Sequence, residues 1–158
     1  MENSKNYSLK TALQFGEGQF IEFKESIDKS LSKEIVAFAN ASGGVIYLGI
    51  TDSGGIKGVK ITNRIKSEIQ DIARNCDPSI FVSLDSNQNV LCISVDEGIS
   101  KPYSCSDGFF LRIGANSQKM KRDEVLTLAV KTGKIRFDEQ ICINLTGMIL
   151  MMINLSII

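Results

Sequence analysis

Hydrophobic and polar positions recur with regular spacing along most of the first 131 residues of this chain. In residues 20–24, Ile21 and Phe23 are expected on one face and Phe20, Glu22 and Lys24 on the other, the period-two pattern of a half-buried strand. Apolar positions in residues 31–39 then recur every three or four residues and predict a helix. Ser30 is its expected N-cap, and Ser42-Gly43-Gly44 ends it.

The later pattern predicts strands that come in hairpins between helices. Regular β-α-β alternation is missing, so we expect an α+β domain with a mixed or antiparallel sheet flanked by helices. The first fifteen residues are expected to form a short helix or arm. The other expected elements are a buried central strand at 45–50, a short returning strand at 56–59, a helix over 61–72, a hairpin of 80–84 with 90–95, a strand at 109–113, and a helix over 123–131 closed by Gly133.

The character of the chain changes after Glu139. Residues 141–158 contain no charge and thirteen apolar side chains, so we divide the chain into a domain at 1–136, with a core at about 13–131, and an apolar tail at 137–158. Eighteen residues reach the lower limit for crossing a bilayer. A membrane anchor is disfavoured by the polar residues inside the tail. A segment covering an exposed face, a dimer contact, and the stub of a missing C-terminal region remain alternatives.

The amino-acid composition limits which catalytic and metal-binding sites the chain can form. The 158 residues carry no net charge and include no histidine, which excludes Ser-His-Asp catalysis and imidazole metal sites. The four cysteines, Cys76, Cys92, Cys105 and Cys142, lack the close spacing of zinc or redox motifs and are expected to be buried free thiols. We therefore expect neither zinc nor haem. The polar N-terminus and the free thiols favour a cytoplasmic location.

Carboxylates around residues 16–26 are the first candidate for chemistry. Glu22 and Lys24 share one face of the expected strand with Phe20, and Glu17 lies between two glycines that allow it to bend toward the same side. Asp52 follows the central strand. Convergence of Glu17, Glu22 and Asp52 would give hard oxygen ligands for Mg²⁺ or Mn²⁺, and Lys24 would stabilise a developing oxyanion. The alternative is a solvated Glu22–Lys24 pair beside a turn aspartate.

A basic surface is the second candidate. Residues 101–136 carry eight basic and three acidic groups, whereas residues 1–100 carry ten and thirteen. Such a segment attracts anions, although a solvated helix face gives the same count. Where a strand ends and a helix begins, backbone amides and cations can face one phosphate. The candidate phosphate-contacting residues are Lys101, Arg112, Asn116, Ser117, Lys119, Lys121 and Arg122.

Several linked motifs resemble one known family. GEGQFIEFKES is followed in order by KEIVAFANASGGVIYLGITDSGGIKG, DPSI, KPY and FFLRIGANSQKMKRDEV. Together these motifs, over about residues 13–131, resemble the Schlafen Alba-like domain, also called a divergent AAA family. The resemblance implies a curved sheet flanked by helices and a nucleic-acid-binding domain of a prokaryotic transcriptional regulator.

The resemblance also implies two alternatives. Animal Schlafens cleave RNA with three carboxylates whose positions match Glu17, Glu22 and Asp52, which implies a metal-dependent endoribonuclease. The AAA label implies an ATP-binding regulatory domain, although the glycine clusters at 43–44 and 54–58 do not form a P-loop. Animal enzymes join two lobes in one chain, so a single lobe implies a homodimer. We expect DNA or RNA as the partner and no membrane.

Overall fold

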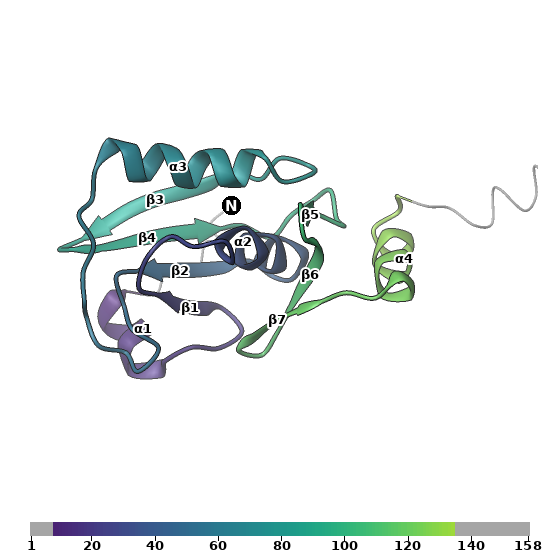
Figure 1. Cartoon of the computed structure of the whole chain (residues 1–158). Coiled ribbons are helices and arrows are strands. Elements are labelled where there is room, and N and C mark those ends of the chain that lie inside the picture. The colour runs from purple at the N-terminus through teal and green to yellow at the C-terminus, as the bar shows by residue number, and fades with distance from the viewer. Residues whose placement is uncertain (1–7, 135–158) are drawn as a thin grey trace, which may run out of the picture.

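The computed structural model describes residues 8–134, which form two sheets and four helices (Figure 1). The described elements are α1 (Leu9–Phe15), β1 (Ile21–Lys24), α2 (Leu31–Asn40), β2 (Gly44–Leu48), α3 (Asn63–Arg74), β3 (Val82–Asn87), β4 (Val90–Val95), β5 (Ser104–Cys105), β6 (Gly108–Ile113), β7 (Asn116–Lys119) and α4 (Arg122–Lys131).

The larger sheet has four strands in the order β1-β2-β4-β3. β1 runs parallel to β2, while β2 with β4 and β4 with β3 are antiparallel. This mixed sheet with helices beside it confirms the α+β expectation. The register sets Glu22 opposite Ile46 and Lys24 opposite Leu48, in β2.

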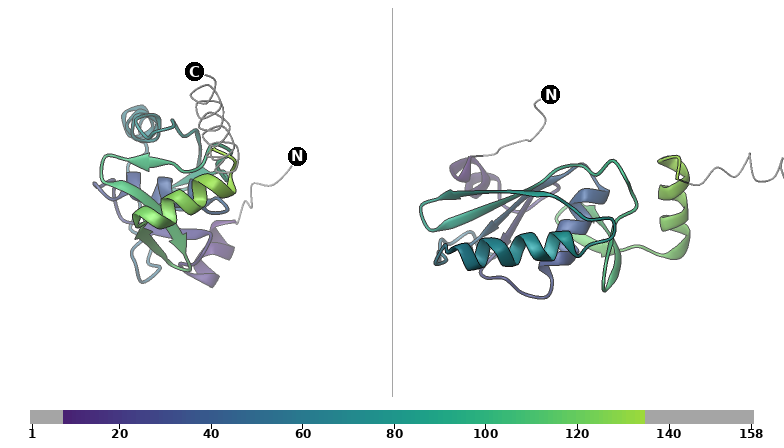
Figure 2. Two further views of the ribbon diagram at one scale, coloured as in Figure 1. Left: turned by 90° about the vertical axis from the view of Figure 1, so that its right-hand side faces the viewer. Right: turned by 90° about the horizontal axis from the view of Figure 1, so that it is seen from above.

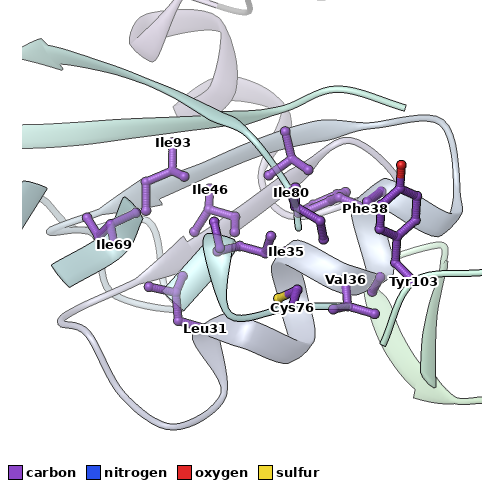
Figure 3. Packing of buried hydrophobic residues seen from close by; sticks show 14 of the residues in the cluster. Leu31, Ile35, Val36, Phe38, Ile46, Ile69, Cys76, Ile80, Ile93 and Tyr103 are labelled. Atoms are coloured by element: carbon purple, nitrogen blue, oxygen red, sulfur yellow. The ribbon is translucent and has the colours of Figure 1, made fainter. Parts of the chain in front are cut away.

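Apolar side chains cover both faces of this sheet. On one face, α2 and α3 pack onto β2 and β4 and form the larger core, which includes Ile35, Phe38 and Ile69 (Figure 3). On the other face, α1 covers a smaller cluster that includes Ile21 and Phe23, as the alternation at 20–24 predicts. Because successive strand residues point to opposite faces, Glu22 and Lys24 face α2 rather than open solvent.

The second sheet has three strands in the order β5-β6-β7 and packs against α2. α4 follows β7 and lies apart from both sheets, as Figure 1 and the right-hand view of Figure 2 show. At the C-terminal end of α4, the Thr132 hydroxyl donates a hydrogen bond to the Lys101 carbonyl at 2.9 Å, which connects the helix to the segment before β5.

The AFANASGG motif joins α2 to both sheets. The Asn40 amide is buried; it donates to the carbonyls of Tyr103 and Phe110, both at 2.9 Å, and its oxygen accepts from the Tyr103 N–H at 2.7 Å. Gly43 has φ +74°, and a Cβ there would lie 2.7 Å from the Val95 carbonyl oxygen. A Cβ on Gly44 would lie 2.4 Å from the Phe38 ring. The motif therefore encodes close packing at a helix end.

The other predicted elements are found with small differences. Residues 56–59 do not form a strand, although Ile56 makes an isolated bridge with Ile50. Ser30 precedes α2 without a capping hydrogen bond from its side chain. No helix among the described residues has the length and apolar character needed to cross a bilayer. The apolar tail at 137–158 and Cys142 lie outside the described residues.

Candidate functional site

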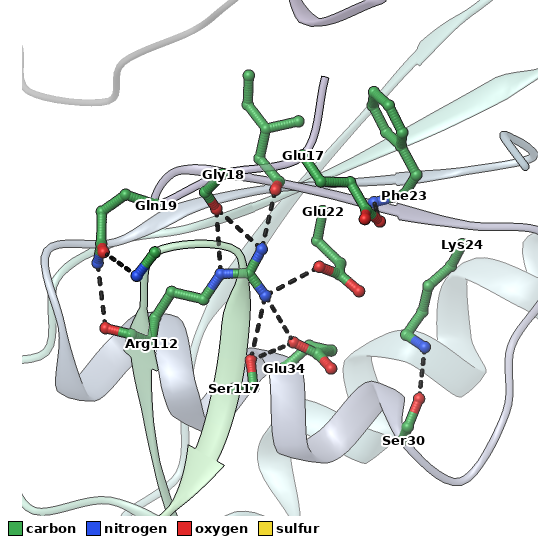
Figure 4. Close-up of polar contacts among 12 residues, drawn as sticks. Glu17, Gly18, Gln19, Glu22, Phe23, Lys24, Ser30, Glu34, Arg112 and Ser117 are labelled. Atoms are coloured by element: carbon green, nitrogen blue, oxygen red, sulfur yellow. Dashed lines mark hydrogen bonds and ion pairs between the residues drawn. The ribbon is translucent and has the colours of Figure 1, made fainter. Parts of the chain in front are cut away.

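Arg112 of β6 lies at the centre of a polar cluster between the two sheets (Figure 4). Its side chain is only 1% exposed. Nε and Nη2 both donate to the Gly18 carbonyl, at 3.1 and 2.8 Å, and Nη2 also donates to the Ile21 carbonyl at 3.0 Å. The planar Arg112 guanidinium, with its five N–H donors, thus fixes the loop before β1 to β6. A lysine could not replace it, because its ammonium is a single point charge.

Two carboxylates share the other side of the guanidinium. Nη1 lies 2.8 Å from Glu22 Oε2 and 3.2 Å from Glu34 Oε2. The Ser117 hydroxyl donates to Glu34 and accepts from Nη1. Phe38 lies beneath, with its ring centroid 4.8 Å from the Arg112 Cζ, close enough for a cation–π contact. We call Arg112, Glu22, Glu34 and Ser117 the arginine cluster.

The arginine cluster holds one positive charge against two carboxylates, and this imbalance affects Glu22. Its pKa is raised from 4.5 to about 7, first by burial and then by the charge of Glu34, against the lowering effect of Arg112. Glu17 adds a smaller contribution in the same direction. Glu22 therefore changes protonation near neutral pH, where an ordinary glutamate is fully ionised.

Glu17 and Lys24 lie at the border of the arginine cluster. The Glu17 carboxylate is exposed and accepts a hydrogen bond from the Phe23 N–H at 3.1 Å. Lys24 points away from Glu22: Figure 4 shows its ammonium directed to the Ser30 hydroxyl, and Asp28 lies 3.4 Å from it. The structure thus brings Glu17 and Glu22 near each other, while Lys24 stabilises the turn before α2.

Asp52 does not join the two glutamates. Glu22 is level with Ile46 in the middle of β2, whereas Asp52 lies past the end of that strand in an exposed turn. Residues 8–134 contain no group of three or more Asp, Glu or Cys side chains that could hold a metal ion. Because Glu22 is also bound to Arg112, these residues do not form the predicted three-carboxylate site: Asp52 does not converge with Glu17 and Glu22.

Three of the predicted phosphate contacts serve internal interactions instead. Arg112 and Ser117 belong to the arginine cluster, and a guanidinium that is 1% exposed cannot reach a phosphate. Lys101 is 12% exposed; its ammonium donates to the Ala41 carbonyl at 2.8 Å and contacts Glu97 at 2.6 Å. For these three residues the prediction is wrong, because carbonyl, carboxylate or guanidinium groups inside the protein already occupy their polar atoms.

The other four predicted contacts are exposed. Asn116 and Lys119 begin and end β7, and Lys121 and Arg122 stand at the start of α4. Arg122 pairs with Asp123 at 3.1 Å at the surface, a contact that costs little to break. The backbone N–H of Lys121 donates to Glu124 at 2.7 Å, so this amide is not free to bind an anion as the sequence suggested. We call Lys119, Lys121 and Arg122 the basic strip.

Glu34 was missed by the sequence analysis. It lies in the first turn of α2, on the side of an apolar helix that faces β1, and its partner Arg112 is 78 residues away. The only available signal was a glutamate in a helix expected to be buried on one face.

Comparisons with known proteins agree with this architecture. The family described as Schlafen, AlbA_2 matches residues 17–121, which is most of the described chain. The chain belongs to this family. The match confirms the resemblance seen in the motifs, and it spans the β1 loop, the arginine cluster and the first part of the basic strip.

A solved structure extends the likeness of this AlbA_2 domain to the fold. The crystal structure of the DIP2311 protein from Corynebacterium diphtheriae is similar with a TM-score of 0.55 at 21% sequence identity. The likeness covers 70% of this chain but 24% of that protein, so the AlbA_2 domain spans about a quarter of its length. Among curated proteins, no significant match is found.

Proposed function

We propose that this AlbA_2 domain binds nucleic acid, as part of a prokaryotic transcriptional regulator, and that the basic strip contacts the phosphates. The observation that carries the proposal is the exposure of Lys119, Lys121 and Arg122 in one continuous segment that leaves a sheet and enters a helix. Cations of this kind give affinity for phosphates without reading the sequence. Asn116, exposed at the start of β7, can add a hydrogen bond.

The arginine cluster supports this proposal by holding β6 and β7 in place. Arg112 connects β6 to the β1 loop, and Ser117 connects β7 to Glu34 of α2. Gln19 adds two further contacts, donating to the Arg112 carbonyl at 3.1 Å and accepting from the Gly114 N–H at 2.8 Å. The N-terminal end of β7, the strand that ends at Lys119, is therefore held in place. This reduces the conformational entropy that the strand would lose on binding a phosphate.

A homodimer would have a larger phosphate-binding surface than a single chain. Three cations per chain form a small footprint, and we propose a homodimer in which two basic strips bind one duplex or hairpin. A ribonuclease has less support, because Glu22 is engaged with Arg112 and Asp52 is elsewhere.

Salt-dependent binding tests the proposal. Fluorescence anisotropy with a labelled DNA duplex and a labelled RNA hairpin should show a slope of log K against log salt of about −2.7 per chain, for three neutralised phosphates. Between about 50 and 200 mM salt, affinity for the duplex should then fall about 40-fold for one bound chain and about 1,800-fold for a dimer that binds with both basic strips. Binding that does not respond to salt would contradict the proposal.

A matched pair of variants localises the surface. Lys119→Gln, Lys121→Gln and Arg122→Gln together remove three positive charges from the basic strip. The control triple Lys60→Gln, Arg64→Gln and Arg74→Gln removes three exposed charges on and before α3. We expect the first triple variant to lose most of the salt-dependent affinity and the control to keep it. Equal losses in both would refute this location.

A further inference from the structure

Two cysteines meet where the chain after α3 pairs with β5. Asp77 and Ser104 exchange two backbone hydrogen bonds, each 2.8 Å long, in an antiparallel bridge. Cys76 immediately precedes Asp77, and Cys105 immediately follows Ser104. In an antiparallel pair, the positions next to a doubly hydrogen-bonded pair lie opposite each other at closer Cα spacing, about 4.5 Å. That spacing lies within the range that a disulfide spans.

The side chains of these two cysteines also point the same way. Cys76 is buried in the larger core, and Cys105 is partly buried and packs against that same core. Both line one surface cavity of about 360 Å³, beside Asp28, Lys29 and Asn75, so a small reagent can reach Cys105, the more exposed of the two. Their electrostatic coupling fits this proximity, because Cys105 adds to the effect of burial in raising the pKa of Cys76 to about 12.

In the reduced protein, each thiol makes only one weak hydrogen bond. Cys76 Sγ donates to the Ile72 carbonyl at 3.4 Å, and Cys105 Sγ donates to the Gly108 carbonyl at 3.6 Å. Both contacts lie within local segments, and sulfur is a weak donor. Little is lost when both sulfurs turn toward each other.

We propose that Cys76 and Cys105 are a modification site that forms a reversible disulfide with an external low-molecular-weight disulfide as oxidant. The Cys105 thiolate attacks one sulfur of the oxidant, which breaks its S–S bond and releases one thiol. The Cys76 sulfur then loses its proton to solvent and attacks Cys105 Sγ, which releases the second thiol. The protein loses two protons and two electrons, which reduce the oxidant to two thiols.

The bond would join the C-terminal end of α3 to β5 across a loop of about 30 residues. A closure of this length restricts the unfolded chain, so the oxidised protein should unfold at a higher temperature, by roughly 5 to 15 °C. This inference does not depend on the proposed nucleic-acid binding.

The test uses the full chain and oxidised glutathione. After alkylation of the remaining thiols, cleavage before aspartate separates Cys76, Cys92 and Cys105 into the peptides 71–76, 85–95 and 96–106. We expect peptides 71–76 and 96–106 to be linked in the monomeric protein, with dithiothreitol releasing them. Linkage through 85–95, dimers linked between chains, or a stable glutathione adduct on Cys105 beside a free Cys76 would overturn the proposal.

Variants and unfolding provide the second measurement. With Cys76→Ser, oxidation should stop at the glutathione adduct on Cys105, whereas Cys92→Ser should leave the disulfide unchanged. The wild-type digestion needs neither variant, so a folding defect in one of them does not affect it. An unfolding temperature that is equal or lower in the oxidised protein would contradict the expected closure.

Discussion

Replacing Arg112 with methionine tests whether this side chain is a structural connection. The change removes the donor to the Gly18 and Ile21 carbonyls and leaves Glu22 and Glu34 enclosed without their cation. Removing one partner of a buried ion pair costs about 3–5 kcal/mol, because the remaining charge stays desolvated. We therefore expect Arg112→Met to lower the free energy of unfolding by about this amount, measured by urea denaturation at pH 8.

A compensating variant separates this effect from lost packing. Arg112→Met combined with Glu22→Gln and Glu34→Gln removes both uncompensated carboxylates and should recover at least about 1 kcal/mol relative to Arg112→Met alone. Arg112→Lys keeps the charge but cannot bond two carbonyls and two carboxylates together, so it should be intermediate. A loss below about 1 kcal/mol for Arg112→Met, or no recovery in the triple variant, would refute the structural role.

Three further outcomes follow from the same contacts. The folded-state pKa of Glu22, about 7, lies above its ordinary 4.5, so its contribution to stability is present below pH 4.5 and is lost as pH rises through 7. Relative to Glu22→Gln, the wild type should lose up to about 3 kcal/mol of unfolding free energy across this range, and a flat difference would contradict the pKa. Gly44→Ala should lower the thermal midpoint markedly, since its Cβ would lie 2.4 Å from the Phe38 ring; an unchanged midpoint would show that Phe38 moves freely. Asn40→Leu should cost about 2–4 kcal/mol in urea unfolding, as it leaves two carbonyls and one N–H unsatisfied in the core, and a near-neutral result would mean that water replaces the amide.

The larger elements of the fold could be predicted because their signals are local. The spacing of isoleucines located α3, and the glycine-bounded apolar run located β2. β7 (Asn116–Lys119) was missed because all its residues are polar, and its pairing to β6 depends on cross-strand hydrogen bonds rather than on an apolar face. α1 was expected only as a short helix or arm, because a seven-residue helix with two buried positions shows too few apolar repeats to define a helical pattern.

The candidate site could be predicted only in part, because its contacts connect distant segments. The pattern at 20–24 correctly put Ile21 and Phe23 in the core, but it left the opposite face open to solvent. That face is covered by α2 and β6, which bring Glu34 and Arg112 to Glu22 across 12 and 90 residues of sequence. A basic residue near the C-terminal third appears the same in sequence whether it meets a phosphate or an internal carboxylate. Burial decides between these roles.

The salt dependence of nucleic-acid binding by a compensated arginine variant tests the central claim most directly. If Arg112 is structural and the basic strip binds phosphates, Arg112→Met with Glu22→Gln and Glu34→Gln, measured at a temperature where it is folded, should keep the wild-type slope of log K against log salt. Lys121→Gln should reduce the magnitude of that slope by about 0.9 for each bound chain. A reduced slope in the arginine variant together with an unchanged slope in Lys121→Gln would reverse the two roles and contradict the account.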